Sequence, residues 1–299
     1  MLPKKEIQAL FHLIDDPDDE VYDTVASQLL HYGKEIIPGL EHLWETTEDE
    51  DVQDRIAQLI HRVHFQDVQK ELQHWADAAN PELLRGAILV AKYQYPDMNI
   101  PFLLTQFDQV RRNLWLELNN YLTPIEKVNT FNGILYNYYK IQGHELSEQK
   151  PEHFFVNKVL ESKQGNAFTI GALYVALAEL LDIPVLAVNI PRQFLLAYVD
   201  TLQHFYARGS EAMQQNSFYI DPMNGMIYTQ NDVEFYLNKI GVNPRLQEHY
   251  GSLNTVQIVH RMLTELGLCY THHHEEERAD EIRLLIDILE QSTHFPGHT

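Results

Sequence analysis

The stretch that decides the fold is KQGNAFTIGALYVALAELL, residues 163–181. Asn166 is suited to cap a helix that begins at the next residue, which puts Thr169 at the third helical position. Almost every side chain that follows is apolar, and Glu179 is the lone charge of the helix. A helix that is apolar all round is surrounded by protein. The stretch therefore predicts a central buried helix, packed against a sheet, with one hydroxyl near its N-terminus.

Short strands follow this helix along the chain. PVLAVNI (184–190) and QFLLAYV (193–199) are runs of residues that favour a sheet. SFYIDPMNGMIYT (217–229) has the pattern of two strands joined by a turn with Pro and Asn-Gly. This order predicts an α+β fold in which helices pack on an antiparallel sheet, and it defines a central domain over residues 119–243.

The N-terminal region, residues 1–118, has a helical pattern with an internal repeat. DDEVYDTVASQLL (18–30) and DEDVQDRIAQLIH (49–61) align at an offset of 31 residues, with acidic and apolar positions in register. NPELLRGAILVAKY (80–93) is a weaker third copy. Units of this kind cannot bury their apolar faces alone and must stack. The pattern resembles HEAT-type repeats and predicts an α-helical repeat domain.

The C-terminal region, residues 244–299, contains two helical patterns with the polar segment THHHEEERAD between them. It therefore predicts a C-terminal helical hairpin. The three adjacent histidines His272, His273 and His274 can bind a transition metal, but neighbouring residues do not converge on one ion without help. A polar loop is the favoured interpretation, and the sequence predicts neither a metal site nor a cofactor.

Composition limits the classes of partner. The chain has 299 residues, a formal net charge of −21 and a single cysteine, Cys269. Such a surface repels phosphate backbones and anionic lipids, so we expect no nucleic acid and no membrane as partners. The longest apolar region, residues 170–190, is broken by charges and a proline, which argues against a membrane span. One cysteine and no secretory signal pattern predict a cytoplasmic protein.

A helix N-terminus aimed at a sheet is where thiol enzymes place a nucleophile, because the helix dipole lowers the pKa of a cysteine there. A histidine on the facing strand takes the proton, and a carboxylate on the next strand orients that histidine. GNAFTIGALYVALAELLDIPVLAVNIPRQFLLAY, with YIDPMNG downstream, resembles the transglutaminase-like superfamily and especially its bacterial SirB-type branch. VNKVLESKQGN and IEKVNTFNGILYNYYK add to this likeness, which extends over residues 120–270.

The resemblance implies a papain-like α+β fold, and it lets the Cys-His-Asp triad of the superfamily be carried over. The cysteine position falls on Thr169, the histidine position on Gln193 and the aspartate position on Asp221. A threonine hydroxyl is a poor nucleophile without a strong base beside it. Gln193 cannot be that base, because an amide does not accept a proton usefully. Asp221 then has no imidazole to orient, and a turn aspartate that caps backbone amides is the simpler interpretation.

These replacements favour a catalytically degenerate protein that acts as a binding or scaffold module for a protein or peptide partner. We expect five residues to line the remaining cleft: Asn166, Thr169, Arg192, Gln193 and Asp221. They would either bind a ligand or satisfy one another and water in a closed relic.

Two alternatives stay open at the level of sequence. In the first, the protein is a hydrolase of amide or ester bonds that uses Thr169 with His204 and Asp221, or with a bound metal. In the second, the repeats of residues 1–118 bind a peptide and the central domain is a spacer. The sequence also leaves the oligomeric state open.

Overall fold

The structure is a computed structural model that describes residues 4–16, 18–145, 150–188, 190–199, 218–244 and 250–295. The chain divides into two compact units, Met1–Leu72 and Gln73–Thr299. This division differs from the predicted domain boundaries at residues 118 and 243.

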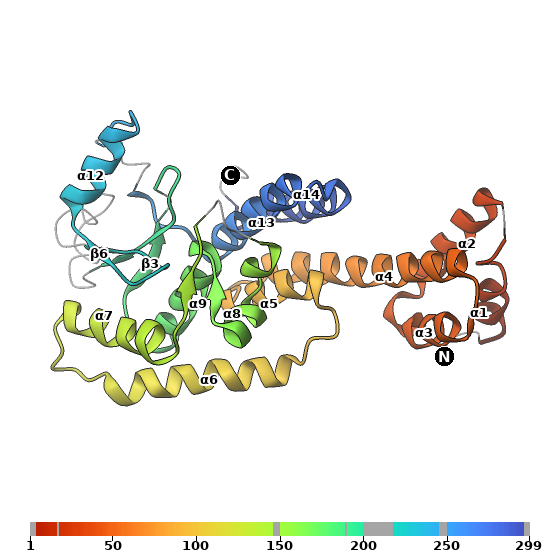
Figure 1. The fold of residues 1–299 in the computed structure, drawn as a ribbon, viewed down its shortest axis with the longest axis horizontal. Coiled ribbons are helices and arrows are strands. Elements are labelled where there is room, and N and C mark those ends of the chain that lie inside the picture. The colour runs from red at the N-terminus through yellow and green to blue at the C-terminus, as the bar shows by residue number, and fades with distance from the viewer. Residues whose placement is uncertain are drawn as a thin grey trace. The chain divides into compact units, whose positions relative to one another are not determined.

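The first unit is a set of helices around a small core. Its elements are α1 (Lys4–Phe11), α2 (Asp19–His31), η1 (Gly33–Ile36), α3 (Ile37–Thr46) and most of α4 (Glu50–Ala76) (Figure 1). Gly33 has a left-handed φ of +64°, so the chain leaves α2 without the strain that a side chain would add. One cluster of buried apolar side chains, including Val25, Leu29, Leu40 and Ile56, forms the core.

The second unit has an α+β architecture. Its helices are α5 (Leu83–Gln94), α6 (Ile100–Glu117), α7 (Pro124–Asn132), the π-helix η2 (Gly133–Tyr138), η4 (Pro151–Phe154), α8 (Val156–Ser162), α9 (Ala167–Leu180), α12 (Gln230–Lys239), α13 (Thr255–His272) and α14 (Glu276–Glu290). Its strands are β1 (Gln142–Gly143), β2 (Gln164–Gly165), β3 (Val185–Val188), β4 (Leu195–Tyr198), β5 (Phe218–Ile220) and β6 (Ile227–Tyr228).

Four of these strands form an antiparallel sheet in the order β3-β4-β5-β6, which confirms the predicted antiparallel sheet. Tyr219 pairs with Tyr228 and Ile220 with Ile227, so β5 and β6 form the hairpin expected around the Asn-Gly turn. β1 and β2 add a short parallel pair that the sequence did not indicate.

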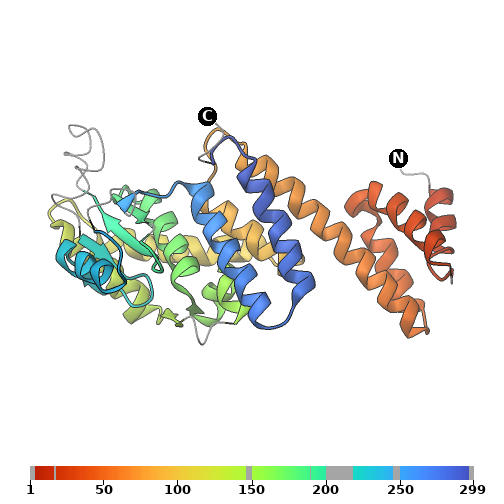
Figure 2. The same ribbon diagram turned by 90° about the horizontal axis from the view of Figure 1, so that it is seen from above.

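α9 is the central helix that the sequence predicts. The Asn166 side chain caps it, because its Oδ1 accepts the backbone N–H groups of Phe168 and Thr169 at 3.0 and 2.9 Å. Every residue from Phe168 to Ala178 is buried. β3 and β4 contact α9, and α5, α8 and α13 pack around it as well (Figures 1 and 2). With protein on all of these sides, residues 168–178 of the helix can lack charged side chains altogether.

The sheet also has a core on the side of α12. Alternate residues of the β4 segment, Leu195, Ala197 and Val199, join Val233 and Leu237 of α12 in one buried cluster. α9 contacts the same strand. β4 therefore lies between two helical layers, which explains why all four of its residues are buried.

Helix contacts explain why the compact units differ from the predicted domains. α13 packs against α5 and α9 and along α14, and Figure 2 shows α13 and α14 side by side. α5, the expected third repeat, has its contacts with α8, α9 and α13. The second expected repeat begins α4, which continues as one helix of 27 residues. The HEAT-like repeats and a separate C-terminal domain stay predictions.

Candidate functional site

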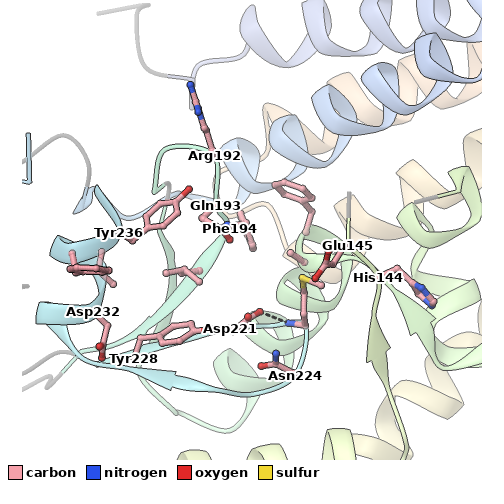
Figure 3. Close-up of a pocket in the computed structure, with 16 residues that line it drawn as sticks. His144, Glu145, Arg192, Gln193, Phe194, Asp221, Asn224, Tyr228, Asp232 and Tyr236 are labelled. Atoms are coloured by element: carbon pink, nitrogen blue, oxygen red, sulfur yellow. Dashed lines mark hydrogen bonds between the residues drawn. The ribbon is translucent and has the colours of Figure 1, made fainter. Parts of the chain in front are cut away.

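A pocket of about 890 Å³ lies beside the N-terminus of α9 (Figure 3). Its walls come from the segment after β1, the first residues of α9, the turn before β4, the turn after β5, and from β6 and α12. The pocket therefore lies where the central helix meets the sheet, which is the location that the sequence predicts for a site.

Asp221 is held at the start of the turn that follows β5. Its backbone N–H donates to the Met226 carbonyl at 2.8 Å, and its carbonyl accepts the Gly225 N–H at 2.8 Å. Its side-chain Oδ1 accepts the Met223 N–H at 2.8 Å, and the Tyr228 hydroxyl also bonds to the carboxylate. Burial raises the pKa of the Asp221 carboxyl, and these hydrogen bonds oppose the shift. The carboxylate caps a turn amide and faces the pocket.

Two side chains of α7 and η2 fix this turn in place. Asn132 donates from Nδ2 to the Gly225 carbonyl at 2.7 Å, and the Tyr136 hydroxyl donates to the Pro222 carbonyl at 2.9 Å. Gly225 has a φ of +76°, and a side chain there would collide with the Tyr136 ring. π-Helical turns such as η2 are frequent at functional sites. The placement of Asp221 therefore depends on a helix far away in the sequence.

Arg192 and Gln193 occupy the turn before β4. The Gln193 N–H donates to the Ile190 carbonyl at 2.9 Å, and Arg192 has a left-handed φ of +62°. Both side chains are exposed and both line the pocket. Figure 3 shows the Arg192 guanidinium directed away from Asp221. The structure thus brings three of the expected cleft residues, Arg192, Gln193 and Asp221, to one pocket.

Thr169 and Asn166 do not line this pocket, in contrast to the expectation from sequence. Both are fully buried. The Thr169 hydroxyl and the Asn166 Nδ2 have no hydrogen-bond partner among the residues that the structure describes. At this end of α9 the pocket is lined by Phe168 and Phe194 instead.

The Phe194 ring is seated on a surface of α9 that lacks a side chain, at Gly171. A Cβ at Gly171 would lie 2.5 Å from the nearest carbon of the Phe194 ring. Phe168 is three residues before Gly171 and therefore shares its helical face. The ring centroids of Phe168 and Phe194 are 5.1 Å apart. The start of α9 and the entry to β4 thus pack closely and form an apolar wall.

Several lining residues escaped the sequence interpretation. Tyr228 could have been predicted as a lining residue, because the expected hairpin places it on the strand that follows the Asp221 turn. Tyr236 of α12 donates its hydroxyl to the Pro191 carbonyl at 3.1 Å, which is a tertiary contact that no local pattern signals. His144 stacks on His153 with ring centroids 4.3 Å apart, and Figure 3 shows it directed away from the centre of the pocket.

Other groups that were considered for chemistry lie elsewhere. His204 is outside the described residues. Cys269 is buried in α13, where burial, together with Glu275, raises the pKa of its thiol to about 11. Such a thiol is protonated near neutral pH and is a poor nucleophile. Within the described part of the chain, no three His, Cys, Asp or Glu side chains are grouped so that they would hold a metal ion.

Comparison with known proteins identifies the class to which this fold and site belong. The profile of the Transglutaminase-like superfamily matches residues 102–264, more than half of the chain, and the chain belongs to that superfamily. The resemblance seen in the sequence is therefore confirmed.

Individual relatives narrow the class to the SirB-type branch. Protein SirB1 of Salmonella typhimurium is 21% identical over 209 residues, which cover 69% of this chain and 72% of that protein. A UPF0162 protein of Vibrio cholerae is 21% identical over 187 residues, 62% of this chain and 65% of that protein. F-box only protein 21 of Pongo abelii is 26% identical over 143 residues, 46% of this chain and 21% of that protein. No solved structure matches the chain.

Proposed function

We propose that this protein is a catalytically degenerate member of its superfamily that binds a segment of a protein or peptide partner in the pocket. The observation that carries the proposal is the chemistry of the lining. Gln193 and Asp221 line the pocket, whereas Thr169 is buried outside the lining. At the three positions carried over from the triad, the pocket therefore offers no thiol or hydroxyl nucleophile and no imidazole to activate one.

The size and lining of the pocket support binding. A volume of about 890 Å³ falls within the range of ligand pockets in proteins. Phe168 and Phe194 supply an apolar wall, and Phe235 of α12 is 72% exposed at the pocket. Exposed aromatic side chains next to a concave surface are typical anchors for a partner.

The wider proposal concerns the rest of the chain. In it, the N-terminal helices act as a HEAT-like docking surface, α13 and α14 act as a hairpin that supports the central domain, and the protein works in the cytoplasm. The repeat between residues 18–30 and 49–61 supports the first part. A single cysteine in the whole sequence, Cys269, fits a reducing compartment. None of the helices in the described segments is long and apolar enough to cross a bilayer.

The test combines a substrate screen with peptide selection on the purified full-length protein. We expect no turnover of amide or ester substrates, and we expect a random displayed peptide library to yield ligands. Affinity for these ligands should fall about tenfold or more in Phe235→Ala, because an exposed aromatic anchor is lost. Leu268→Ala is the control, since Leu268 is 54% exposed on α13 and lies outside the lining.

Two results would contradict this function. Turnover that disappears in Thr169→Ala would support the hydrolase with altered chemistry instead. Peptide affinity that is the same in Phe235→Ala and wild type would mean that the ligand binds elsewhere, as expected if the N-terminal repeats bind the peptide.

A further inference from the structure

Negative charges outnumber positive charges among the residues that line the pocket. Three carboxylates, those of Glu145, Asp221 and Asp232, line it, and Arg192 is the one Lys or Arg among the described lining residues. The Arg192 side chain is exposed and, in Figure 3, extends away from Asp221. His144 also points away from the centre of the pocket. The inner surface is therefore acidic, in a chain whose net charge is −21.

The partly buried carboxylate of Asp221 would be stabilised by a positive charge. Its two hydrogen-bond donors, the Met223 N–H and the Tyr228 hydroxyl, are both neutral. No described Lys or Arg acts on the carboxylate, which burial disfavours in its charged form. A carboxylate in such surroundings gains from a cation that arrives with a ligand, because the pair offsets the cost of removing the charge from water.

The walls around Asp221 suit a flat and weakly hydrated cation. Phe168 and Phe194 line the same pocket, together with Tyr228 and Met223. Phe168 already stacks with one guanidinium of this chain, since the Cζ of Arg261 lies 5.6 Å from its ring centroid. A guanidinium can lie flat on an aromatic ring and can pair with a carboxylate through two parallel N–H groups, whereas an ammonium has neither the flat shape nor the paired N–H groups.

We propose that the pocket recognises an arginine side chain in the bound peptide, with the guanidinium paired to Asp221 and the side chain next to it packed on Phe168 and Phe194. This ligand class rests on the proposed function, since it specifies what the peptide must carry. The acidic lining and the negative charge of the whole chain attract such a ligand, and Arg192, directed outward, does not compete for Asp221.

The test compares two peptides that differ in one charge. The first is Gly-Phe-Arg-Phe-Gly, and the second replaces arginine by citrulline, its neutral isostere. Calorimetric titration of full-length protein should give at least about tenfold tighter binding of the arginine peptide, because a charge-assisted hydrogen bond is lost in the other. A lysine peptide should fall between the two, and added salt should weaken the arginine peptide more than the citrulline peptide.

Variants test whether Asp221 is the carboxylate that binds the guanidinium of the peptide. Asp221→Asn keeps an oxygen that accepts the Met223 N–H, and it should remove the preference for arginine over citrulline. Asp280→Asn is the control, because Asp280 is an exposed residue of α14 whose partner is Arg283. It should retain the full preference. Thermal melts of both variants establish that each is folded before the titrations are compared.

Several outcomes would overturn this inference. Equal affinity for the arginine and citrulline peptides overturns it and leaves peptide binding in the pocket intact. A preference for arginine that persists in folded Asp221→Asn also overturns it. Failure of both peptides to bind overturns it as well, and the library selection then decides separately whether the proposed function survives.

Discussion

Two polar groups are buried at the N-terminus of α9, and the structure describes no partner for either. These are the Thr169 hydroxyl and the Asn166 Nδ2, both in residues that are fully buried. A buried polar group without a hydrogen bond costs stability. The side-chain oxygen of Asn166, in contrast, is hydrogen-bonded, because Oδ1 accepts two helix N–H groups. The cap explains why asparagine stands at 166, whereas no contact in the described chain uses the hydroxyl of Thr169.

Replacement of this hydroxyl by a methyl group should stabilise the protein. We expect Thr169→Val to raise the free energy of unfolding by about 1 kcal/mol, because it removes an unsatisfied buried polar group and keeps a β-branched shape. Urea denaturation would measure the change. The control is Thr130→Val, since the Thr130 hydroxyl donates to the Glu126 carbonyl at 2.9 Å and its loss should bring no gain. A loss of stability in Thr169→Val would mean that the hydroxyl has a partner elsewhere in the chain.

At the scale of elements, the contact between α9 and the start of β4 depends on a missing side chain. Alanine is a better helix former than glycine, yet a Cβ at Gly171 would lie 2.5 Å from the Phe194 ring. We expect Gly171→Ala to destabilise the protein by about 1–3 kcal/mol, because the close packing leaves no room for a methyl group. Denaturation curves would measure this change.

A second variant separates this clash from a general effect of alanine. Phe194→Leu in the background of Gly171→Ala should recover part of the loss, so that the two changes are not additive. Gly133→Ala is the matched control, because nothing lies within 4 Å of a Cβ at Gly133, and it should not destabilise. Equal effects at the two glycines would show that the Phe194 contact does not limit the packing.

Local pattern predicted much of the second unit because its central elements have local causes. The apolar run of α9, the cap at Asn166 and the hairpin of β5 and β6 each follow from adjacent residues. The pairing of β1 with β2 could not be predicted in this way, since it joins segments that are distant in the sequence. For the same reason, adjacent residues do not predict the hydrogen bonds by which Asn132 and Tyr136 hold the turn of Asp221.

The candidate site was predictable only in its polar part. The resemblance to the superfamily pointed to Gln193 and Asp221, and both line the pocket. It pointed to Thr169 as well, but Phe168 and Phe194 form the wall at that end of the helix. Hydrophobic patterns place Phe168 in a core without distinguishing a core from a pocket wall. Phe235 enters the site because α12 packs on the sheet, which a single sequence does not reveal.

At the scale of the whole molecule, each unit has its own core, and the two should unfold separately. Leu40 is fully buried in the core of the first unit, and Leu173 is buried in α9 of the second. Trp75, 1% exposed, belongs to the second unit and donates its indole N–H to the Glu82 carbonyl at 2.9 Å. With the exposed Trp44 and Trp115 replaced by phenylalanine, the fluorescence of Trp75 would report on the second unit alone.

We expect Leu40→Ala to destabilise the first unit by about 2–5 kcal/mol, because it leaves a cavity in a closed core. The midpoint of the Trp75 transition in urea should stay unchanged, while circular dichroism should gain an earlier transition. Leu173→Ala is the matched variant and should lower the Trp75 midpoint. Peptide affinity under native conditions should survive Leu40→Ala if the pocket is the binding site. An equal shift of the Trp75 midpoint in both variants would contradict independent unfolding, because it would mean that α4, whose residues belong to both units, couples them into one cooperative structure.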